Sequence, residues 1–346
     1  MIEKIKISVK NIDEKLNKIY FFVQDTRGNA KASIRYIYEM AMTLKNNGYN
    51  VIMLFEKKDY IPVTSWLGGS YDELKHQSLE GTNLEIAPED ILVIPEIFGF
   101  VMEQVKNLPC GKIVLVQAYD HMLETLAPGA TWPQYGFLKC ITTSETQKEQ
   151  ISKIMKHVSF EVIEPVIHES FTPQKYPAKP MIGVWSREQR DGLNVIKQFY
   201  IKYPQYRFFT FKDLRGLSQD EFANSLQDCF LGVWIDPTSG FGTFPIECMR
   251  TGIPVIGKIP NLQPEWMNEK NGIWLDNTNM MVDVIADVIQ TWLEDNVNQE
   301  LYEEGAKTAE KYIDKEKFDF SVVSTFSSFS DKRKEAFEAQ IENLSK

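Results

Sequence analysis

The chain has 346 residues, which is enough for two domains of ordinary size. Hydrophobic residues make up 43% of it and charged residues 25%, a composition typical of a soluble globular protein. The formal net charge of −10 argues against a nucleic-acid partner, because phosphate backbones demand clustered Lys and Arg side chains.

Signals for export and for membrane insertion are absent from the sequence. No apolar run approaches the length of a membrane span, and residues 1–6 lack the apolar core of a signal peptide. The four cysteines, Cys110, Cys140, Cys229 and Cys248, form no paired spacing, which disfavours both disulfides and a zinc site. We therefore expect a cytoplasmic protein, and we leave open a peripheral membrane or partner-protein contact.

The first half of the chain alternates apolar runs with helical patterns. Residues 18–24 predict a buried parallel strand, and residues 33–46 carry apolar side chains at helical spacing. A strand at 51–55 completes a strand–loop–helix–strand unit, which implies a right-handed crossover in a parallel sheet. Further strands are expected at 90–95, 112–117, 140–143 and 160–163.

The second half repeats this plan after a proline-rich stretch. Strands are expected at 181–185, 206–211, 231–235, 254–257 and 272–275, and helices at 193–202, 219–226, 280–293 and 301–311. We predict a first domain at 1–168, a linker at 169–180, a second domain at 181–318 and a helical tail at 319–346.

One segment of the second half carries the strongest functional signal. After the apolar run 231–235, a loop with Gly240 and Gly242 leads into a short helix that carries Glu247. Glycines let the loop backbone approach a ligand closely, and the N–H groups of the first helical turn favour a phosphate. From that helix, a carboxylate can accept hydrogen bonds from a diol such as a ribose. On spacing alone, a loop that needs glycines for its turn, with a solvated Glu247, stays open.

The wider pattern resembles the donor-binding signature of retaining GT-B glycosyltransferases of the family-four type. The matching stretches are Gly240-Phe241-Gly242, Glu247-Cys248-Met249 and Gly252-Ile253-Pro254-Val255-Ile256. Ser239 stands where that signature has its first glutamate, and residues 57–90 and 315–346 carry no match. The resemblance implies an α/β fold of the GT-B type, with two Rossmann-like domains facing across a cleft. The first domain is then expected to bind the acceptor and the second the nucleotide-sugar donor.

The resemblance also assigns roles to residues of the second domain. Arg187 and Arg190 are expected to grip the donor diphosphate, because guanidinium groups suit phosphate oxygens; a solvated surface pair is the alternative. Glu247 is expected to accept hydrogen bonds from the ribose hydroxyls. By resemblance, Ser239 is expected to lie near the donor sugar, to which a serine offers hydrogen bonds but no full charge. The complete donor-binding set is Gly28, Asn29, Ser239, Gly240, Phe241, Gly242, Thr243, Glu247 and Glu265, with the ring of Phe241 expected to pack internally.

His121 and Asp120 follow the predicted strand at 112–117 in the first domain. The resemblance implies that His121 contacts the sugar, and Asp120 is placed to orient its imidazole or to bind an acceptor hydroxyl. We group both with Arg187 and Arg190 as candidate catalytic residues. For His121, a histidine that merely satisfies a loop stays an alternative.

We therefore predict a glycosyltransferase that moves a sugar from a nucleotide-sugar donor to a hydroxyl of a glycan, a lipid-linked acceptor or a protein, as in polysaccharide biosynthesis. By resemblance it retains anomeric configuration and uses no cofactor and no metal, because arginines and helix dipoles replace the ion at the diphosphate. Since the first signature carboxylate is missing, a catalytically silent partner subunit that binds sugar nucleotides is a second hypothesis. A GT-B-fold nucleotide-sugar epimerase is a third, although that chemistry needs a carboxylate cluster that we do not find.

Overall fold

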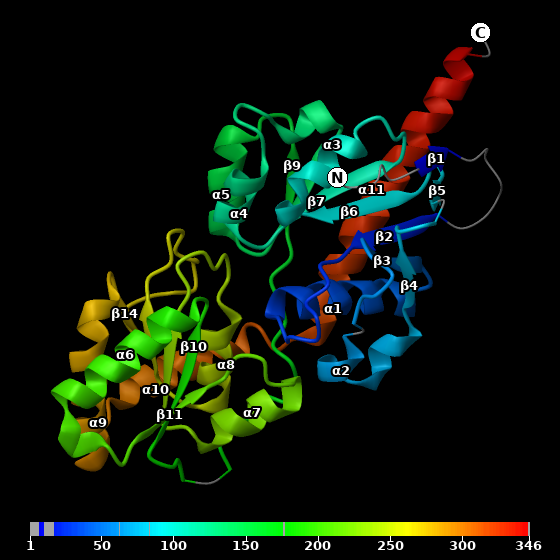
Figure 1. Cartoon of the computed structure of the whole chain (residues 1–346). Coiled ribbons are helices and arrows are strands. Elements are labelled where there is room, and N and C mark those ends of the chain that lie inside the picture. The colour runs from blue at the N-terminus through cyan, green and yellow to red at the C-terminus, as the bar shows by residue number, and fades with distance from the viewer. Residues whose placement is uncertain (1–6, 10–16, 62, 83, 176, 345–346) are drawn as a thin grey trace. The chain divides into compact units, whose positions relative to one another are not determined.

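The computed structural model describes residues 7–9, 17–61, 63–82, 84–175 and 177–344 (Figure 1). The chain divides into two compact α/β units, each described here by itself. Among the described residues, the first unit takes those up to 143, those at 147–164 and those from 315 onward; the second takes 144–146 and 165–314. The predictions for the start of the chain and for its tail rest partly on residues 1–6 and 345–346. These residues lie outside the described ones.

The first unit is built on a parallel sheet of seven strands in the order β4-β3-β2-β6-β7-β8-β9. Its strands are β2 (Lys18–Phe22), β3 (Asn50–Phe55), β4 (Lys75–Ser78), β6 (Ile91–Pro95), β7 (Gly111–Val116), β8 (Lys139–Thr142) and β9 (Ser159–Val162). Every residue of β6, β7 and β8 is buried, as expected for parallel strands covered on both faces. A separate two-stranded parallel sheet pairs β1 (Ile7–Val9) with β5 (Leu84–Ile86).

The helices of the first unit include α1, the crossover from β2 to β3, and α11, which returns to this unit from the end of the chain (Figure 1). Their bounds are α1 (Ala32–Asn46), α2 (Thr64–Leu67), α3 (Gly99–Gln104), α4 (Tyr119–Thr125), α5 (Glu145–Ile154) and α11 (Lys315–Leu344).

The C-terminal helix corrects the predicted domain limits, which assigned residues 315–318 to the second domain and 319–346 to a separate tail. Phe318 of α11 packs on Tyr36 of α1, and Phe326 packs on Phe21 of β2. With Val322 between them, these rings form an apolar row at helical spacing, and all three side chains are buried. The hydrophobic row therefore makes α11 a part of the first unit.

The second unit contains a five-stranded parallel sheet in the order β11-β10-β12-β13-β14. Its strands are β10 (Met181–Ser186), β11 (Thr210–Asp213), β12 (Leu231–Ile235), β13 (Val255–Lys258) and β14 (Ile273–Leu275). Its helices are α6 (Gln189–Lys202), α7 (Gln219–Asp228), α8 (Thr243–Thr251), α9 (Met281–Leu293) and α10 (Gln299–Glu310). The two parallel sheets with interleaved helices confirm the predicted α/β class.

Two hydrophobic clusters cover the opposite faces of the second sheet. Trp234 of β12 belongs to a cluster that includes residues of α7, α8 and α10, whereas its neighbours Val233 and Ile235 belong to a cluster with residues of α6 and α9. Successive side chains of a strand point to opposite faces, so β12 lies between two layers of helices. Because β12 is buried along its whole length, polar side chains can stand only beyond its ends.

The strand predicted at 206–211 was wrong in its start. Residues Pro204–Tyr206 form a 3-10 turn instead, and β11 begins only at Thr210. The tyrosines before β11 connect the end of α6 to α9. The hydroxyl of Tyr203 donates a hydrogen bond to Asp283, and that of Tyr206 donates one to Gln290. An aromatic run that resembles a strand therefore serves helix packing.

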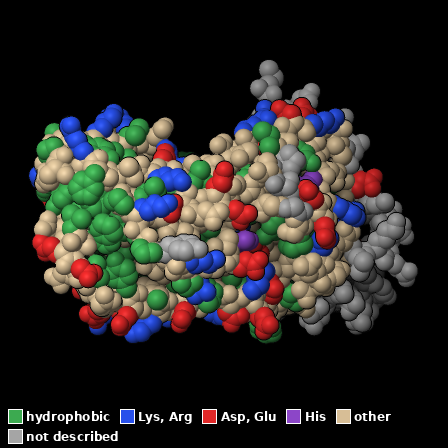
Figure 2. All heavy atoms as spheres, turned by 90° about the horizontal axis from the view of Figure 1, so that it is seen from below, with side chains coloured by type: hydrophobic (Ala, Val, Ile, Leu, Met, Phe, Trp, Pro, Cys, Tyr) green, Lys and Arg blue, Asp and Glu red, His purple; other side chains and the backbone are tan. Residues whose placement is uncertain are grey.

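Hydrophobic side chains also reach the surface (Figure 2). In the second unit, the large exposed ones are Leu193, Ile201, Phe208, Met280, Leu293 and Ile313. A partner-protein or peripheral membrane contact stays a prediction. None of the helices in the described part of the chain combines the length and the apolar character that crossing a bilayer requires.

The pairing of β3 with β4 places His76 of the first unit in an aromatic environment. Its Nε2 atom lies 2.8 Å from the hydroxyl of Tyr38, and its ring stacks on Tyr38 and Tyr60. Burial of the imidazole lowers the pKa of His76 below its ordinary value, since desolvation disfavours the charged form. The unfolded chain therefore binds a proton at this site more readily than the folded one does.

We expect His76 to contribute stability above the pKa of an unfolded histidine and to lose that contribution as the pH falls below it. The free energy of unfolding, measured with denaturant between pH 7.5 and pH 5, should fall less steeply in a His76→Gln variant than in the wild type. His157→Asn, which replaces an exposed histidine of the same unit, is the matched variant for comparison. Equal slopes for His76→Gln and the wild type would contradict this account.

Candidate functional site

The order of strands in the second unit reverses at one place in its sheet. The chain starts with β10, adds β11 on one side and then adds β12 on the other, so the order reverses between β10 and β12. Open parallel sheets bind ligands outside the carboxyl ends of their strands at such a reversal. Arg187 follows β10, and the glycine loop follows β12. The structure thus brings these two groups of predicted residues to the same edge.

The glycine loop leads directly into α8. Gly242 occupies the N-cap position with a φ of +78°, and no side chain caps this helix. Thr243 begins the first turn, where main-chain N–H groups lack partners within the helix. Such a terminus attracts anions, because its N–H groups and the helix dipole both favour negative charge.

Tryptophan side chains support the glycine loop from within the second unit. The indole Nε1 of Trp266 donates a 2.7 Å hydrogen bond to the carbonyl of Phe241. The ring of Phe241 is 4% exposed and lies edge-on to Tyr312, which confirms that it packs internally. A Cβ atom at Gly242 would lie only 2.9 Å from the ring of Trp234. The loop therefore passes so close to the core that only glycine fits at this position.

Glu247 lies one turn inside α8 and is only 2% exposed. This burial contradicts the alternative of a solvated surface glutamate, because nearly all of the residue is shielded from solvent. A carboxylate is kept in a protein interior only with polar partners. Its contact with a ribose stays a prediction, as do ligand contacts of Ser239, Gly240 and Thr243, which lie in the loop and the first turn of α8.

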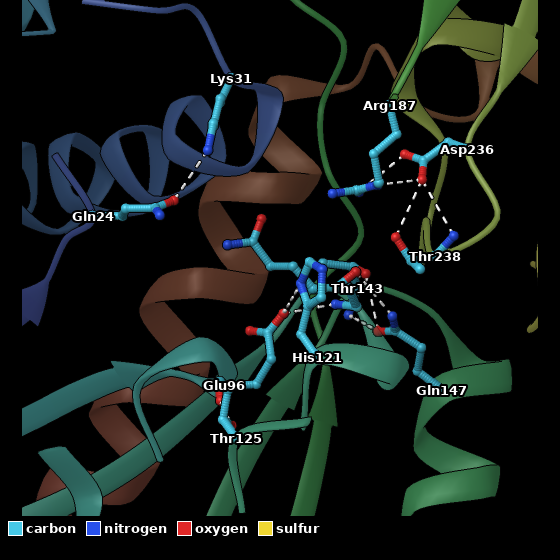
Figure 3. A network of polar contacts seen from close by, with 12 residues as sticks. Gln24, Lys31, Glu96, His121, Thr125, Thr143, Gln147, Arg187, Asp236 and Thr238 are labelled. Atoms are coloured by element: carbon cyan, nitrogen blue, oxygen red, sulfur yellow. Dashed lines mark hydrogen bonds and ion pairs between the residues drawn. The ribbon is translucent and has the colours of Figure 1, made fainter. Parts of the chain in front are cut away.

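The guanidinium of Arg187 lies against a carboxylate that sequence analysis missed. It pairs in a two-point contact with Asp236, the first residue after β12 (Figure 3). Arg190 lies exposed in the first turn of α6, another helix without a side-chain cap. A carboxylate directly after a fully buried strand was the signal available for Asp236, since polar groups there lie at the ligand-binding edge.

Glu265 has a structural role in the second unit. Its carboxylate accepts hydrogen bonds from the main-chain N–H groups of Glu145 and Thr146, at 2.9 and 3.3 Å, and from the hydroxyl of Thr146 at 3.1 Å. Residues 144–146 belong to the second unit, so these hydrogen bonds lie within it. A direct contact of Glu265 with the donor stays a prediction.

The first unit has a reversal of its own, between β2 and β6. Gly28, with a φ of +80°, and Asn29 lie in the loop after β2. The side-chain amide of Asn29 donates to the carbonyl of Thr26 at 2.9 Å, so it closes its own turn. The predicted pair therefore stands at the carboxyl ends of the strands, beside this reversal, and its contact with a ligand stays a prediction.

His121 and Asp120 lie in the first turn of α4, after β7. The imidazole Nδ1 lies 3.9 Å from an oxygen of Glu96, which directly follows β6 and is 3% exposed (Figure 3). The same oxygen accepts a 2.9 Å hydrogen bond from the N–H of Ala118 at the start of α4. Glu96 was not predicted, although it has the same sequence signal as Asp236, a carboxylate directly after a fully buried strand. That Asp120 orients the imidazole stays a prediction. Glu96 is a second carboxylate near the ring.

We expect Gly242→Ala to destabilise the second unit more than Gly252→Ala does. Both positions have a positive φ, but an added Cβ meets the Trp234 ring at position 242 and nothing within 4 Å at position 252. The steric difference should lower the free energy of unfolding by a further 1–3 kcal/mol or so. Denaturant unfolding followed by tryptophan fluorescence measures it. Equal losses in the two variants would show that the loop has room for a side chain.

Comparison with known proteins gives a result for structure only. No protein-family model matches the sequence, and no curated protein matches it significantly. A sucrose-phosphate synthase from Thermosynechococcus elongatus superposes with a TM-score of 0.66 over 90% of this chain and 98% of its own, at 13% identity. HepE from Anabaena, in complex with UDP-glucose, gives a TM-score of 0.61 over 90% of this chain and 99% of its own, at 10% identity.

A glycosyltransferase from Rickettsia africae ESF-5 gives a TM-score of 0.58, covering 91% of this chain and 98% of its own, at 11% identity. The similarity thus extends over nearly the whole length of each of the three proteins. At these identities it establishes architecture and not activity. The chain has the GT-B fold, with two Rossmann-like α/β domains in one polypeptide.

Proposed function

We propose that this protein is a glycosyltransferase that moves a sugar from a nucleotide-sugar donor to a hydroxyl acceptor. The observation that carries the proposal is the edge of the second sheet, where Arg187, the glycine loop and the uncapped start of α8 meet at the strand reversal. These groups suit a diphosphate, which is the part that all nucleotide-sugar donors of this kind share. The likeness to a HepE structure that contains UDP-glucose supports this choice of ligand class.

Each part of the donor has a candidate partner in the second unit. The diphosphate is assigned to the main-chain N–H groups of 240–243 and to Arg187, with Arg190 as an exposed second cation. The ribose hydroxyls are assigned to Glu247. Positive groups and N–H dipoles at this place stabilise the charge that develops on the leaving diphosphate. In this proposal the helix dipole and arginines do this without a metal ion.

The sugar transfer itself is proposed to retain anomeric configuration. The bond between C1 of the sugar and the diphosphate oxygen breaks, and the acceptor oxygen bonds to C1 from the same face. The acceptor proton passes to the departing diphosphate oxygen, so no covalent nucleophile on the protein is required. Ser239 is compatible with this route, because it supplies a hydrogen bond near the sugar and no carboxylate. His121 of the first unit, beside Glu96, is assigned to a sugar hydroxyl.

Nucleoside diphosphates should stabilise the folded protein by mass action. We expect one of UDP, GDP, ADP, CDP and dTDP to raise the melting temperature clearly, and the matching nucleotide-sugars to release that diphosphate slowly in the enzyme's presence. Thermal shift and a diphosphate-release assay measure the two effects. Binding without release, with every sugar tried, would favour the silent-subunit hypothesis. Absence of any shift would overturn the proposed function.

Glu247→Gln should weaken the binding of the nucleoside diphosphate and leave the binding of inorganic pyrophosphate unchanged. The amide preserves the volume of the buried side chain but removes the charge, and a hydrogen bond to a charged group contributes about 1.5–3 kcal/mol. We therefore expect a loss of affinity of about 10-fold or more, measured by isothermal titration calorimetry. Glu303→Gln, at an exposed glutamate of α10, is the matched control. An equal loss of affinity for pyrophosphate would contradict the contact of Glu247 with the ribose.

A further inference from the structure

The pairing of β10 with β12 brings Arg187 and Asp236 together. The register joins Ser186 to Ile235, so Arg187 and Asp236 are the next residues beyond the last pair. The N–H of Arg187 donates to the carbonyl of Ile235 at 2.9 Å, which extends the contact between the two strands. The main chains of both residues are therefore held by the sheet itself, before their side chains meet.

The side chains then meet in a two-point contact. Nε of Arg187 lies 2.5 Å from Oδ1 of Asp236, and Nη2 lies 3.0 Å from Oδ2 (Figure 3). Thr238 secures the carboxylate from the other side, since its N–H and its hydroxyl lie 3.2 and 3.3 Å from Oδ1. Such parallel pairing of a guanidinium with a carboxylate fixes the plane of the arginine as well as its position.

The two partners differ in exposure in a way that suits a ligand site. Asp236 is 3% exposed, whereas the side chain of Arg187 is 34% exposed. Asp236 takes the Nε side of the guanidinium, and Nη1 takes no part in this contact. An arginine held in one orientation binds a phosphate without first losing the freedom of a long side chain. The buried carboxylate also offsets part of the arginine's charge, so the effect of Asp236 on a ligand is mainly an effect on the orientation of Arg187.

We propose that Asp236 is a positioning residue that holds Arg187 for the donor diphosphate. The proposal rests on the proposed function for its ligand, and on the geometry above for the orientation of the arginine. It assigns to Asp236 an effect on binding that passes through Arg187 and not through a contact of its own with the donor.

A double-mutant cycle tests this coupling. Using the nucleoside diphosphate that stabilises the wild type most, we expect Asp236→Asn to bind about 10-fold more weakly in isothermal titration calorimetry. Arg187→Ala and the double variant should bind equally weakly, because the role of Asp236 ends when the arginine is absent. Asp236→Asn binding as tightly as the wild type or tighter, or losing the same factor in the Arg187→Ala background, would overturn the proposal. Asp236→Ser, which keeps a small polar group for Thr238, serves if the amide variant folds poorly.

Two further measurements separate this proposal from a structural role and from the proposed function. Asp283→Asn removes a carboxylate from an exposed ion pair with Lys202 in the same unit and should bind like the wild type. In 15N NMR spectra, the Nε–H of Arg187 should exchange slowly with water in the wild type and rapidly in Asp236→Asn, without any ligand. Unchanged exchange would overturn the positioning role. A wild type that binds no diphosphate would instead overturn the proposed function, and with it the ligand assigned to Arg187.

Discussion

The parallel pairing of β10 with β12 is the constraint on which the candidate site depends. Because β11 was added on the other side of β10, the carboxyl ends of β10 and β12 border a strand reversal. Their register sets Arg187 opposite Asp236, and the loop after β12 leads into α8. Candidate phosphate-binding groups from sequence positions some fifty residues apart are in this way gathered at one edge, without a long loop to hold them.

A second constraint acts from below the loop. Trp234 and Trp266 fill the space under Gly242, so the backbone there follows the surface of a rigid aromatic layer. Well-packed cores change shape little, and a loop that rests on one is held in place before a ligand arrives. The burial of Glu247 in the adjoining helix has the same consequence for its carboxylate. The candidate site is thus built mainly from main-chain groups and fixed side chains.

Local sequence patterns predicted most of the fold. Buried parallel strands such as β12 and β6 consist of unbroken apolar runs, and α1 carries a clear helical spacing. Prediction was weaker wherever the outcome depended on distant partners. The aromatic residues before β11 serve contacts with α9. Helix α11 returns to the first unit through an apolar row that the prediction divided between the second domain and a separate helical tail. The same limit explains the missed carboxylates. Glu96 and Asp236 gain their meaning from residues on neighbouring strands, and the order of strands is not a local property of the sequence.

In the proposed site, the second unit binds a diphosphate between the first turn of α8 and Arg187. A crystal structure of the protein with a bound nucleoside diphosphate tests it most directly. We expect phosphate oxygens within hydrogen-bond distance of main-chain N–H groups of residues 240–243 and of the guanidinium of Arg187. Phosphates found elsewhere on the protein, with this edge of the sheet unoccupied at saturating ligand, would contradict it.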